Sequence, residues 1–598
     1  MDLKTLKAIE PTEYAEAADG YRAVSDVGDL ARDRIDKQIT TAMQKANEGE
    51  AADAALKQLH KLSENFYYAQ VECGLISGAL NGFSSEIAAP RRRLLEALED
   101  AKALSYTVNT DGSVVYPAGG ENELTGEEIP GGTITGNNGI YTPGPGPGTS
   151  GLHSANPHRA KAQDVADRIA HALQEATEID ERYSGALGKL KAAPGLTVDS
   201  KTWADVAADV DTVSTAASEY IRDHIPLDKS AADREKWWAG LSDEERDEYK
   251  RAFPEIIGNL DGIPSVVRDE VNRENLQTLV GKLEGQHDDD SQTKLDGLKG
   301  IQKKLLAGSV PPMLLLGIGD EGNGRAIVAF GNPDTSKNVS AYVPGLGTKL
   351  DGSFADGTVK RAFDTAKDAQ SIDPSSSSIV WLGYDAPQSA DVMTKGDAEK
   401  GAPAYNSFMS GISATNQNSD PHITAIGHSY GSLTVGTAAQ EPGGIPGADD
   451  IILVGSPGVG ANSADDLGVG KGHVWVGAAE NDPVSHLPSE KEAIAGTVGF
   501  FGGGPAAAYL FGDIADQGDD DLWFGKDPAS KAFGANRFTT LPGPYPIEPT
   551  FPDVWKSVTF EAHSNYFSPE DGKDQVSARN IAAIVAGQPG YVTRETPR

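Results

Sequence analysis

The first part of the chain carries apolar residues at the spacing of a helix face. Within residues 1–108, Leu30, Ile35, Ile39 and Met43 recur at roughly helical intervals, as they do in a helix that turns one side toward a core. Almost no proline interrupts the later part of this segment. We therefore predict that residues 1–108 form a helical N-terminal domain.

Two further segments extend this all-α region. Residues 109–160 lack apolar periodicity and carry clustered Gly-Pro dipeptides at 143–148, a composition typical of a Gly/Pro-rich linker in which only residues 114–116 favour a short strand. Helical spacing returns in residues 161–308. This segment includes the pair Trp237-Trp238, which would form a costly apolar patch in open solvent. We therefore expect residues 161–308 to be a helical domain that packs on the domain after it.

Near Val310 the pattern changes to short apolar runs separated by helix-compatible stretches. Such runs, rich in β-branched residues, are typical of buried strands, and their alternation with helices favours a parallel sheet. The predicted strands are a hairpin at 313–317 and 326–330, then 339–343, 378–384, 422–427, 450–455, 473–479 and a last strand at 558–560. The pattern predicts that residues 309–598 are an α/β domain with a doubly wound, mostly parallel sheet, interrupted by a lid-like insert at 488–552.

Candidate chemistry lies in one turn of this domain. The predicted strand 422–427 runs into Gly427-His428-Ser429-Tyr430-Gly431, a G-x-S-x-G pattern followed by a helix-compatible stretch. A strand, a sharp turn and a helix form a nucleophile elbow, in which the serine hydroxyl stands clear of the sheet. The two glycines allow the strand and the helix to pass close to each other. Ser429 is therefore the candidate nucleophile.

The partners of such a serine follow it in the order acid, then histidine. Asp482 comes at the carboxyl end of a predicted strand, where open α/β sheets build their sites, and Glu480 is the alternative acid. Beyond Asp482 the sequence contains only His486 and His563. Because His486 is too close in sequence to face Asp482 from a separate loop, His563 is the candidate base.

An acyl-transfer serine also needs hydrogen-bond donors for the oxyanion. One candidate is the backbone N–H of Tyr430, the residue after the nucleophile. The other comes from the glycine-rich loop Pro344-Gly345-Leu346-Gly347-Thr348, which follows a predicted strand. Leu346 is the favoured donor there, and Gly347 is the alternative.

Further motifs lie on both sides of the elbow. They are Tyr342-Val343-Pro344-Gly345-Leu346-Gly347-Thr348, Glu480-Asn481-Asp482-Pro483, Asp527-Pro528-Ala529-Ser530 with Phe533-Gly534-Ala535, His563-Ser564-Asn565-Tyr566-Phe567 and, upstream, Trp237-Trp238-Ala239-Gly240-Leu241-Ser242, Ile257-Gly258-Asn259-Leu260-Asp261-Gly262-Ile263-Pro264 and Arg268-Asp269. With these residues, the chain from about Val310 onward resembles the α/β-hydrolase superfamily. More narrowly, it is similar to an actinobacterial α/β-hydrolase-type domain of unknown function with a helical N-terminal half. The resemblance implies a serine hydrolase fold and no particular substrate.

The charge and composition exclude several kinds of partner. A net charge of −36, from 88 acidic and 52 basic residues, repels nucleic acid and anionic membrane surfaces. No run of ~18 apolar residues suggests stable membrane insertion. Cys73 is the single cysteine, so no intramolecular disulfide can form. Without an apolar segment near the N-terminus, we expect a cytoplasmic protein, or one exported without a Sec signal peptide. We expect no cofactor and no metal site.

Two hypotheses of function follow. The first is a serine hydrolase, most simply a carboxylic ester hydrolase, that acts on a small-molecule or lipid-like acyl substrate through Ser429, His563 and Asp482. The second is a catalytically silent hydrolase-fold interaction protein, or an effector linked to type VII secretion, with a protein partner on the helical N-terminal region. Tyr68-Ala69-Gln70-Val71-Glu72 matches the Y-x-x-x-[DE] export pattern. The complete order of serine, acid and histidine favours the enzyme.

Overall fold

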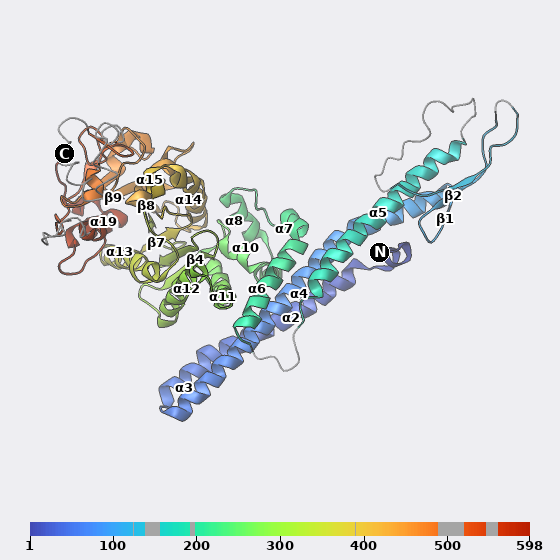
Figure 1. Ribbon diagram of the computed structural model, residues 1–598, viewed down its shortest axis with the longest axis horizontal. Helices are drawn as coiled ribbons and strands as arrows, with labels where there is room; N and C mark the ends of the chain where they lie inside the picture. The colour runs from blue at the N-terminus through green and yellow to red at the C-terminus, as the bar shows by residue number, and fades with distance from the viewer. Residues whose placement is uncertain are drawn as a thin grey trace. The chain divides into compact units, whose positions relative to one another are not determined.

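The chain forms two compact units (Figure 1). The first comprises Met1–Ile225 and Asp243–Phe253, and the second comprises Pro226–Ser242 and Pro254–Arg598. The computed structural model describes residues 1–122, 125–137, 156–191, 198–388, 390–487, 489, 520–545 and 560–598.

The first unit is mostly helical, in agreement with the sequence pattern. Its helices are α1 (Leu3–Ala8), α2 (Pro11–Asp33), the π-helical η1 (Arg34–Thr40), α3 (Thr41–Ala46), α4 (Glu50–Ala103), α5 (Pro157–Leu187), α6 (Ser200–Ala216), α7 (Ser218–His224) and α9 (Asp243–Ala252). A small antiparallel sheet joins β1 (Thr107–Val108), β2 (Val114–Tyr116) and β3 (Gly132–Ile134). The predicted strand at 114–116 is therefore confirmed. The Gly-Pro cluster at 143–148 lies outside the described residues.

The apolar residues that recur at helical spacing along α2 and η1 are only partly buried. Ile35 is buried, whereas Leu30 and Ile39 are exposed. The long helix α4 packs against α2 through both polar and aromatic contacts. The Ser77 hydroxyl donates to the Ala18 carbonyl at 2.8 Å, and the ring centroids of Tyr14 and Phe83 are 4.7 Å apart. Helical spacing thus predicted the elements correctly but not which of their residues are buried.

The helix α9 belongs to the first unit because it packs closely on α4. An ideal Cβ placed on Gly74 would lie 2.8 Å from the Arg251 carbonyl oxygen, and one on Gly78 would lie 2.5 Å from the Ala252 Cβ. Only glycine leaves room for such an approach. The boundaries of the compact units therefore differ from the domain boundaries expected from the sequence, because residues 161–308 contribute helices to both units.

The second unit is built on an eight-stranded sheet in the order β13-β10-β9-β8-β6-β7-β5-β4. Its strands are β4 (Met313–Gly319), β5 (Arg325–Phe330), β6 (Asn338–Val343), β7 (Ser376–Leu382), β8 (His422–His428), β9 (Ala448–Val454), β10 (Val474–Gly477) and β13 (Asn536–Arg537). The hairpin of β4 and β5 and the pairing of β5 with β7 are antiparallel, and the remaining pairs are parallel. The predicted α/β fold with a mostly parallel sheet is confirmed.

Helices cover both faces of this sheet (Figure 1). The helices and helical turns of the unit are α8 (Ala231–Gly240), α10 (Pro254–Asn259), α11 (Ser265–Glu284), α12 (Asp289–Ala307), η2 (Phe354–Thr358), α13 (Val359–Ile372), η3 (Ala390–Met393), α14 (Gly396–Thr415), α15 (Tyr430–Gln440), η4 (Ala464–Leu467), η5 (Lys471–His473), η6 (Pro483–His486), α18 (Glu561–Ser564), α19 (Gln575–Val585) and η7 (Pro589–Tyr591). One core contains residues of α11, α12, α13 and α19, and the other contains residues of α14 and α15. Successive residues of β8 alternate between them, with Ala425 in one core and Ile426 in the other.

The segment before the hairpin covers the outer edge of the sheet at β4. The Asn259 side chain accepts a hydrogen bond from the Ile318 N–H and donates one to the Ile318 carbonyl, both at 3.0 Å. Asp269 accepts from the Leu315 N–H at 2.7 Å, and Asn272 donates to the Leu315 carbonyl at 3.2 Å. These side chains occupy backbone groups that an open edge strand would offer to another chain. The upstream motifs are thus part of the second unit.

The C-terminal part of the chain differs from the strand order expected from the sequence. Residues 558 and 559 of the expected last strand lie outside the described residues, and Phe560 leads into the helical turn α18. The described strand that closes the sheet on this side is β13, which lies within residues 488–552. Much of that expected insert also falls outside the described residues. Its described part includes a two-stranded hairpin of β11 (Asp521–Leu522) and β12 (Gly525–Lys526).

Candidate active site

The predicted elbow has the backbone strain that its sequence implies. Ser429 stands between β8 and α15 with φ 56° and ψ −133°, a left-handed conformation that costs a residue with a side chain roughly 1 to 3 kcal/mol. Its N–H donates to the Val454 carbonyl at 3.0 Å, which ties the turn to β9. An ideal Cβ on Gly431 would lie 2.1 Å from the Val343 carbonyl oxygen. The glycine is therefore needed for α15 to pass over the sheet.

Asp482 and His563 lie together in the fold, although 81 residues separate them in the sequence. His563 Nδ1 is 3.0 and 2.9 Å from the two carboxylate oxygens of Asp482. Asp482 is fully buried, and its carboxylate also accepts from the Tyr566 hydroxyl at 2.6 Å and the Val484 N–H at 2.9 Å. Because Nδ1 donates to Asp482 in this arrangement, the neutral ring keeps Nε2 free to accept a proton.

The surroundings keep the buried acid ionised. Burial alone would raise the pKa of Asp482, but the charge and hydrogen bond of His563, together with hydrogen bonds from Tyr566 and the Val484 N–H, hold the pKa below its ordinary value. Burial and the neighbouring Asp482 charge raise the pKa of Tyr566 well above its usual range. Tyr566 therefore stays protonated and donates to the carboxylate. Its hydroxyl in turn accepts from the Ala479 N–H at 2.9 Å.

Ser429 and His563 line the same pocket, which has a volume of about 320 Å³. Gly455, at the end of β9, brings the acid–base pair close to the elbow. An ideal Cβ there would lie 2.8 Å from both Asp482 Oδ2 and His563 Nδ1. Within the described contacts, no hydrogen bond joins the Ser429 hydroxyl to His563. Catalytic hydrogen bonds are often long before substrate binds.

The structure distinguishes the two candidate oxyanion donors in the loop after β6. The Gly347 N–H donates to the Pro387 carbonyl at 2.8 Å and is occupied. Among the described residues, the N–H groups of Leu346 and Tyr430 donate to no protein acceptor. Leu346 is half exposed and lines the pocket. Gly345 brings the loop against the elbow, because an ideal Cβ there would lie 2.7 Å from the Tyr430 nitrogen.

The alternative acid, Glu480, is placed differently. Its side chain is exposed, and its backbone carbonyl lies 3.1 Å from His486 Nε2. Glu480 makes none of the described contacts with His563. Asp482, two residues later, is the acid that the fold brings to the histidine.

Sequence reasoning missed His428, which stands directly before the nucleophile. His428 Nε2 donates to the His563 carbonyl at 2.8 Å, and the two rings stack with centroids 4.6 Å apart. Burial, with the nearby charges of His563 and Arg361, lowers the pKa of His428 well below its usual range, so the ring is neutral. Arg361 Nη1 lies 3.5 Å from the remaining nitrogen, Nδ1. The motif position of His428 was visible in the sequence, but its contact with the candidate base was not.

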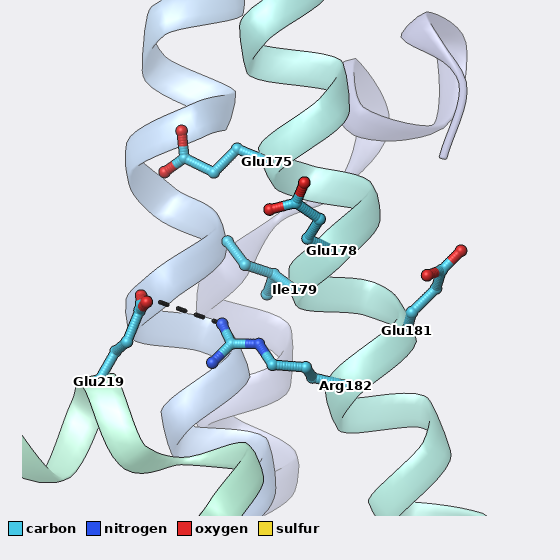
Figure 2. A pocket seen from close by; sticks show the side chains of 6 residues that line it. All are labelled: Glu175, Glu178, Ile179, Glu181, Arg182 and Glu219. Atoms are coloured by element: carbon cyan, nitrogen blue, oxygen red, sulfur yellow. Dashed lines mark ion pairs between the residues drawn. The ribbon is translucent and has the colours of Figure 1, made fainter.

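A larger hollow, of about 570 Å³, lies on the helical unit and has a different character (Figure 2). Four glutamates surround Arg182 and Ile179 there, namely Glu175, Glu178, Glu181 and Glu219. Arg182 is paired with Glu86 and lies 4.0 Å from Glu219. The described residues that line this hollow include no serine, threonine or cysteine, so the candidate nucleophile remains the one in the second unit.

The described part of the chain contains no group of three or more His, Cys, Asp or Glu side chains placed to hold a metal ion. None of the helices described combines the length and the apolar character needed to cross a membrane.

Comparisons with known proteins identify the family. A family model described as alpha/beta hydrolase matches residues 320–491. An uncharacterized protein of Mycobacterium tuberculosis is 30% identical over 413 residues, which cover 63% of this chain and 60% of that relative. An uncharacterized protein of Mycobacterium bovis is 35% identical over 206 residues, which cover 33% of this chain and 76% of that relative. The chain belongs to the alpha/beta hydrolase family, and these relatives are mycobacterial, as the narrower resemblance implied.

Proposed function

We propose that this protein is a serine hydrolase that cleaves an ester or a related acyl bond. One observation carries the proposal: Ser429 has the strained backbone of a nucleophile elbow and lines the same pocket as His563, which is hydrogen-bonded to Asp482. The chain spans about 60% of the length of the Mycobacterium tuberculosis relative. The proposed activity is therefore that of the site around Ser429. Its proposed substrate is a small-molecule or lipid-like acyl compound.

In the first half of the reaction, His563 Nε2 accepts the proton of the Ser429 hydroxyl as Oγ bonds to the substrate carbonyl carbon. The carbonyl oxygen gains the negative charge, and the N–H groups of Leu346 and Tyr430 stabilise it. Each such donor is worth about 3 kcal/mol of barrier. Asp482 stabilises the imidazolium that forms. When the carbon–oxygen bond to the alcohol breaks, His563 returns the proton to the leaving oxygen, and an acyl-enzyme remains.

In the second half, water replaces the alcohol. His563 accepts a proton from the water as its oxygen attacks the acyl carbon. The bond to Ser429 Oγ then breaks, and the proton passes back to Oγ. The products are the carboxylic acid and the free enzyme, so the cycle needs no cofactor.

An activity-based probe tests the proposal. A fluorophosphonate should label the wild-type protein at Ser429, and p-nitrophenyl ester turnover should disappear in Ser429→Ala. Ser432→Ala is the matched control, because the Ser432 hydroxyl donates to the Gly427 carbonyl at 3.0 Å and does not line the pocket. Unchanged turnover in Ser429→Ala would refute the assignment.

The alternative is a silent hydrolase-fold protein that acts through its helical unit. Its sequence support is the Y-x-x-x-[DE] match, but Tyr68 and Glu72 are both buried within α4. In this conformation the two side chains are not displayed to a receptor. Absence of probe labelling in the folded protein would favour this alternative over the enzyme.

A further inference from the structure

The pocket beside Ser429 contains two positive charges that no described carboxylate neutralises. Lys349 and Arg361 both line it, and neither lies within 4.0 Å of a carboxylate oxygen in the described part of the chain. No Asp or Glu is among the described lining residues. The chain as a whole has 88 acidic and 52 basic residues. Among the described lining residues, this pocket therefore carries only positive charge, although the chain as a whole is acidic.

Arg361 is fixed in place by neutral partners. Its Nη1 donates to the Tyr342 hydroxyl at 2.9 Å and lies 3.5 Å from His428 Nδ1. The guanidinium carbon is 5.9 Å from the centroid of the Phe567 ring. Among the described residues, no further acceptor takes a hydrogen bond from this guanidinium. The remaining N–H groups of Arg361 are thus available to a ligand. The contacts with Tyr342 and Phe567 fix the orientation of the guanidinium before a ligand binds.

Three hydroxyl side chains stand near the cations in the sequence and line the same pocket. Thr348, Ser353 and Thr358, like Lys349 and Arg361, come from one segment, residues 348–361. The Thr348 and Thr358 hydroxyls, together with a guanidinium and an ammonium, suit the oxygens of a carboxylate or phosphate group. The Ser353 hydroxyl already donates its one proton to Asp351. The neighbouring carboxylate of Asp351 is already engaged, since it accepts from the Ser353 hydroxyl and the Phe354 N–H.

We infer that the pocket selects acyl substrates that carry an anionic group, carboxylate or phosphate, bound by Arg361 and Lys349. The inference rests on the proposed hydrolase function and adds the substrate class to it. A charge-assisted hydrogen bond in a partly buried site contributes enough to favour the anionic substrate about tenfold. Added salt lowers this preference, because it screens the attraction.

Two esters that differ only at the chain end test the inference. They are p-nitrophenyl valerate, which ends in a methyl group, and mono-p-nitrophenyl glutarate, which ends in a carboxylate. After subtraction of the rate with Ser429→Ala, the wild-type protein should show kcat/KM about tenfold higher for the glutarate ester. Equal values in a protein whose turnover depends on Ser429 would overturn the inference and leave the hydrolase function standing.

Substitutions separate recognition of the anion from a structural role. Arg361→Gln and Lys349→Met should each reduce the ratio of the two kcat/KM values, and Arg361→Lys should keep more of it than Arg361→Gln. A merely structural Arg361 would lower both values equally. Lys360→Met is the control, because Lys360 is paired with Asp364 and Glu570 outside the pocket. It should leave the ratio unchanged.

Binding provides a readout that does not need turnover. Calorimetry with Ser429→Ala should show several-fold tighter binding of the glutarate ester than of the valerate ester, and equal binding would overturn the inference even if no ester is hydrolysed. Competition then identifies the anion. If glutarate competes with binding of the glutarate ester more strongly than inorganic phosphate does, the subsite prefers a carboxylate, and the reverse order indicates a phosphate. If neither anion competes, the result contradicts the anion subsite.

Discussion

His428 donates a hydrogen bond to the backbone carbonyl of His563, and its ring stacks on the ring of the same residue. The residue before the proposed nucleophile thus holds the proposed base by both its backbone and its side chain. Since the His428 ring is neutral, it adds no charge next to the imidazolium that catalysis would form. We interpret His428 as a positioning residue.

The first prediction concerns this contact. His428→Phe keeps a stacked ring but cannot donate to the His563 carbonyl, and loss of one such hydrogen bond corresponds to about a tenfold lower kcat. KM for a p-nitrophenyl ester should change little. His428→Gln, whose amide can donate, should recover part of the rate. A rise in KM together with a drop in kcat, with no recovery in His428→Gln, would indicate general damage to the pocket.

The acid is tested by comparing two neighbouring carboxylates. Asp482→Asn should lower kcat by about 10⁴, because the amide can hold the wrong imidazole tautomer. Glu480→Gln should leave the rate within twofold, since the Glu480 side chain is exposed. Both rates come from the same esterase assay. If Glu480→Gln is the damaging change, the acid has been assigned two residues too late.

The strained backbone at Ser429 predicts that a glycine there gives a more stable but inactive protein. Ser429→Gly removes the cost of a side chain at φ 56°, so it should raise the free energy of unfolding relative to Ser429→Ala by about 1 kcal/mol. Both variants should be inactive. Chemical denaturation followed by tryptophan fluorescence measures the difference. Equal stability of the two variants would mean that the solution backbone at residue 429 is relaxed.

The helical unit should depend on pH through a buried carboxyl group. Burial, with the charges of Asp209 and Asp205, raises the pKa of Glu72 from 4.5 to about 8. Burial, with Asp205, also raises the pKa of Asp209, to about 6. Between the unfolded and folded values of Glu72, the folded state holds a proton that the unfolded state has lost. The free energy of unfolding therefore falls as pH rises through this window.

Glu72→Gln removes the titrating group and should flatten this dependence. Its stabilising effect relative to wild type should be about 3 kcal/mol larger at pH 8 than at pH 5. Denaturation followed by circular dichroism at both pH values measures it. Glu99→Gln, an exposed position on the same helix, is the control. A gain that is the same at both pH values would contradict the raised pKa.

The sequence predicted the parts of the fold and site that depend on local pattern. Short apolar runs located β4 to β10, and the chain order of serine, acid and histidine singled out Asp482 and His563. Contacts between distant segments left no such signal. The hydrogen bond between His428 and His563 spans 135 positions, and the occupied N–H of Gly347 depends on Pro387. The assignment of α9 to the helical unit likewise depends on glycines far away, in α4.

The edge of β4 is covered by the side chains of Asn259, Asp269 and Asn272. This cover limits where the chain can be cut to give a separate domain. The family match begins at residue 320, after β4 has ended. A piece cut there would expose β5 as a bare edge, ready to pair with a second copy of itself. In evolution or in the laboratory, the hydrolase can therefore be moved to a new context only together with helices that lie outside its recognised family signature.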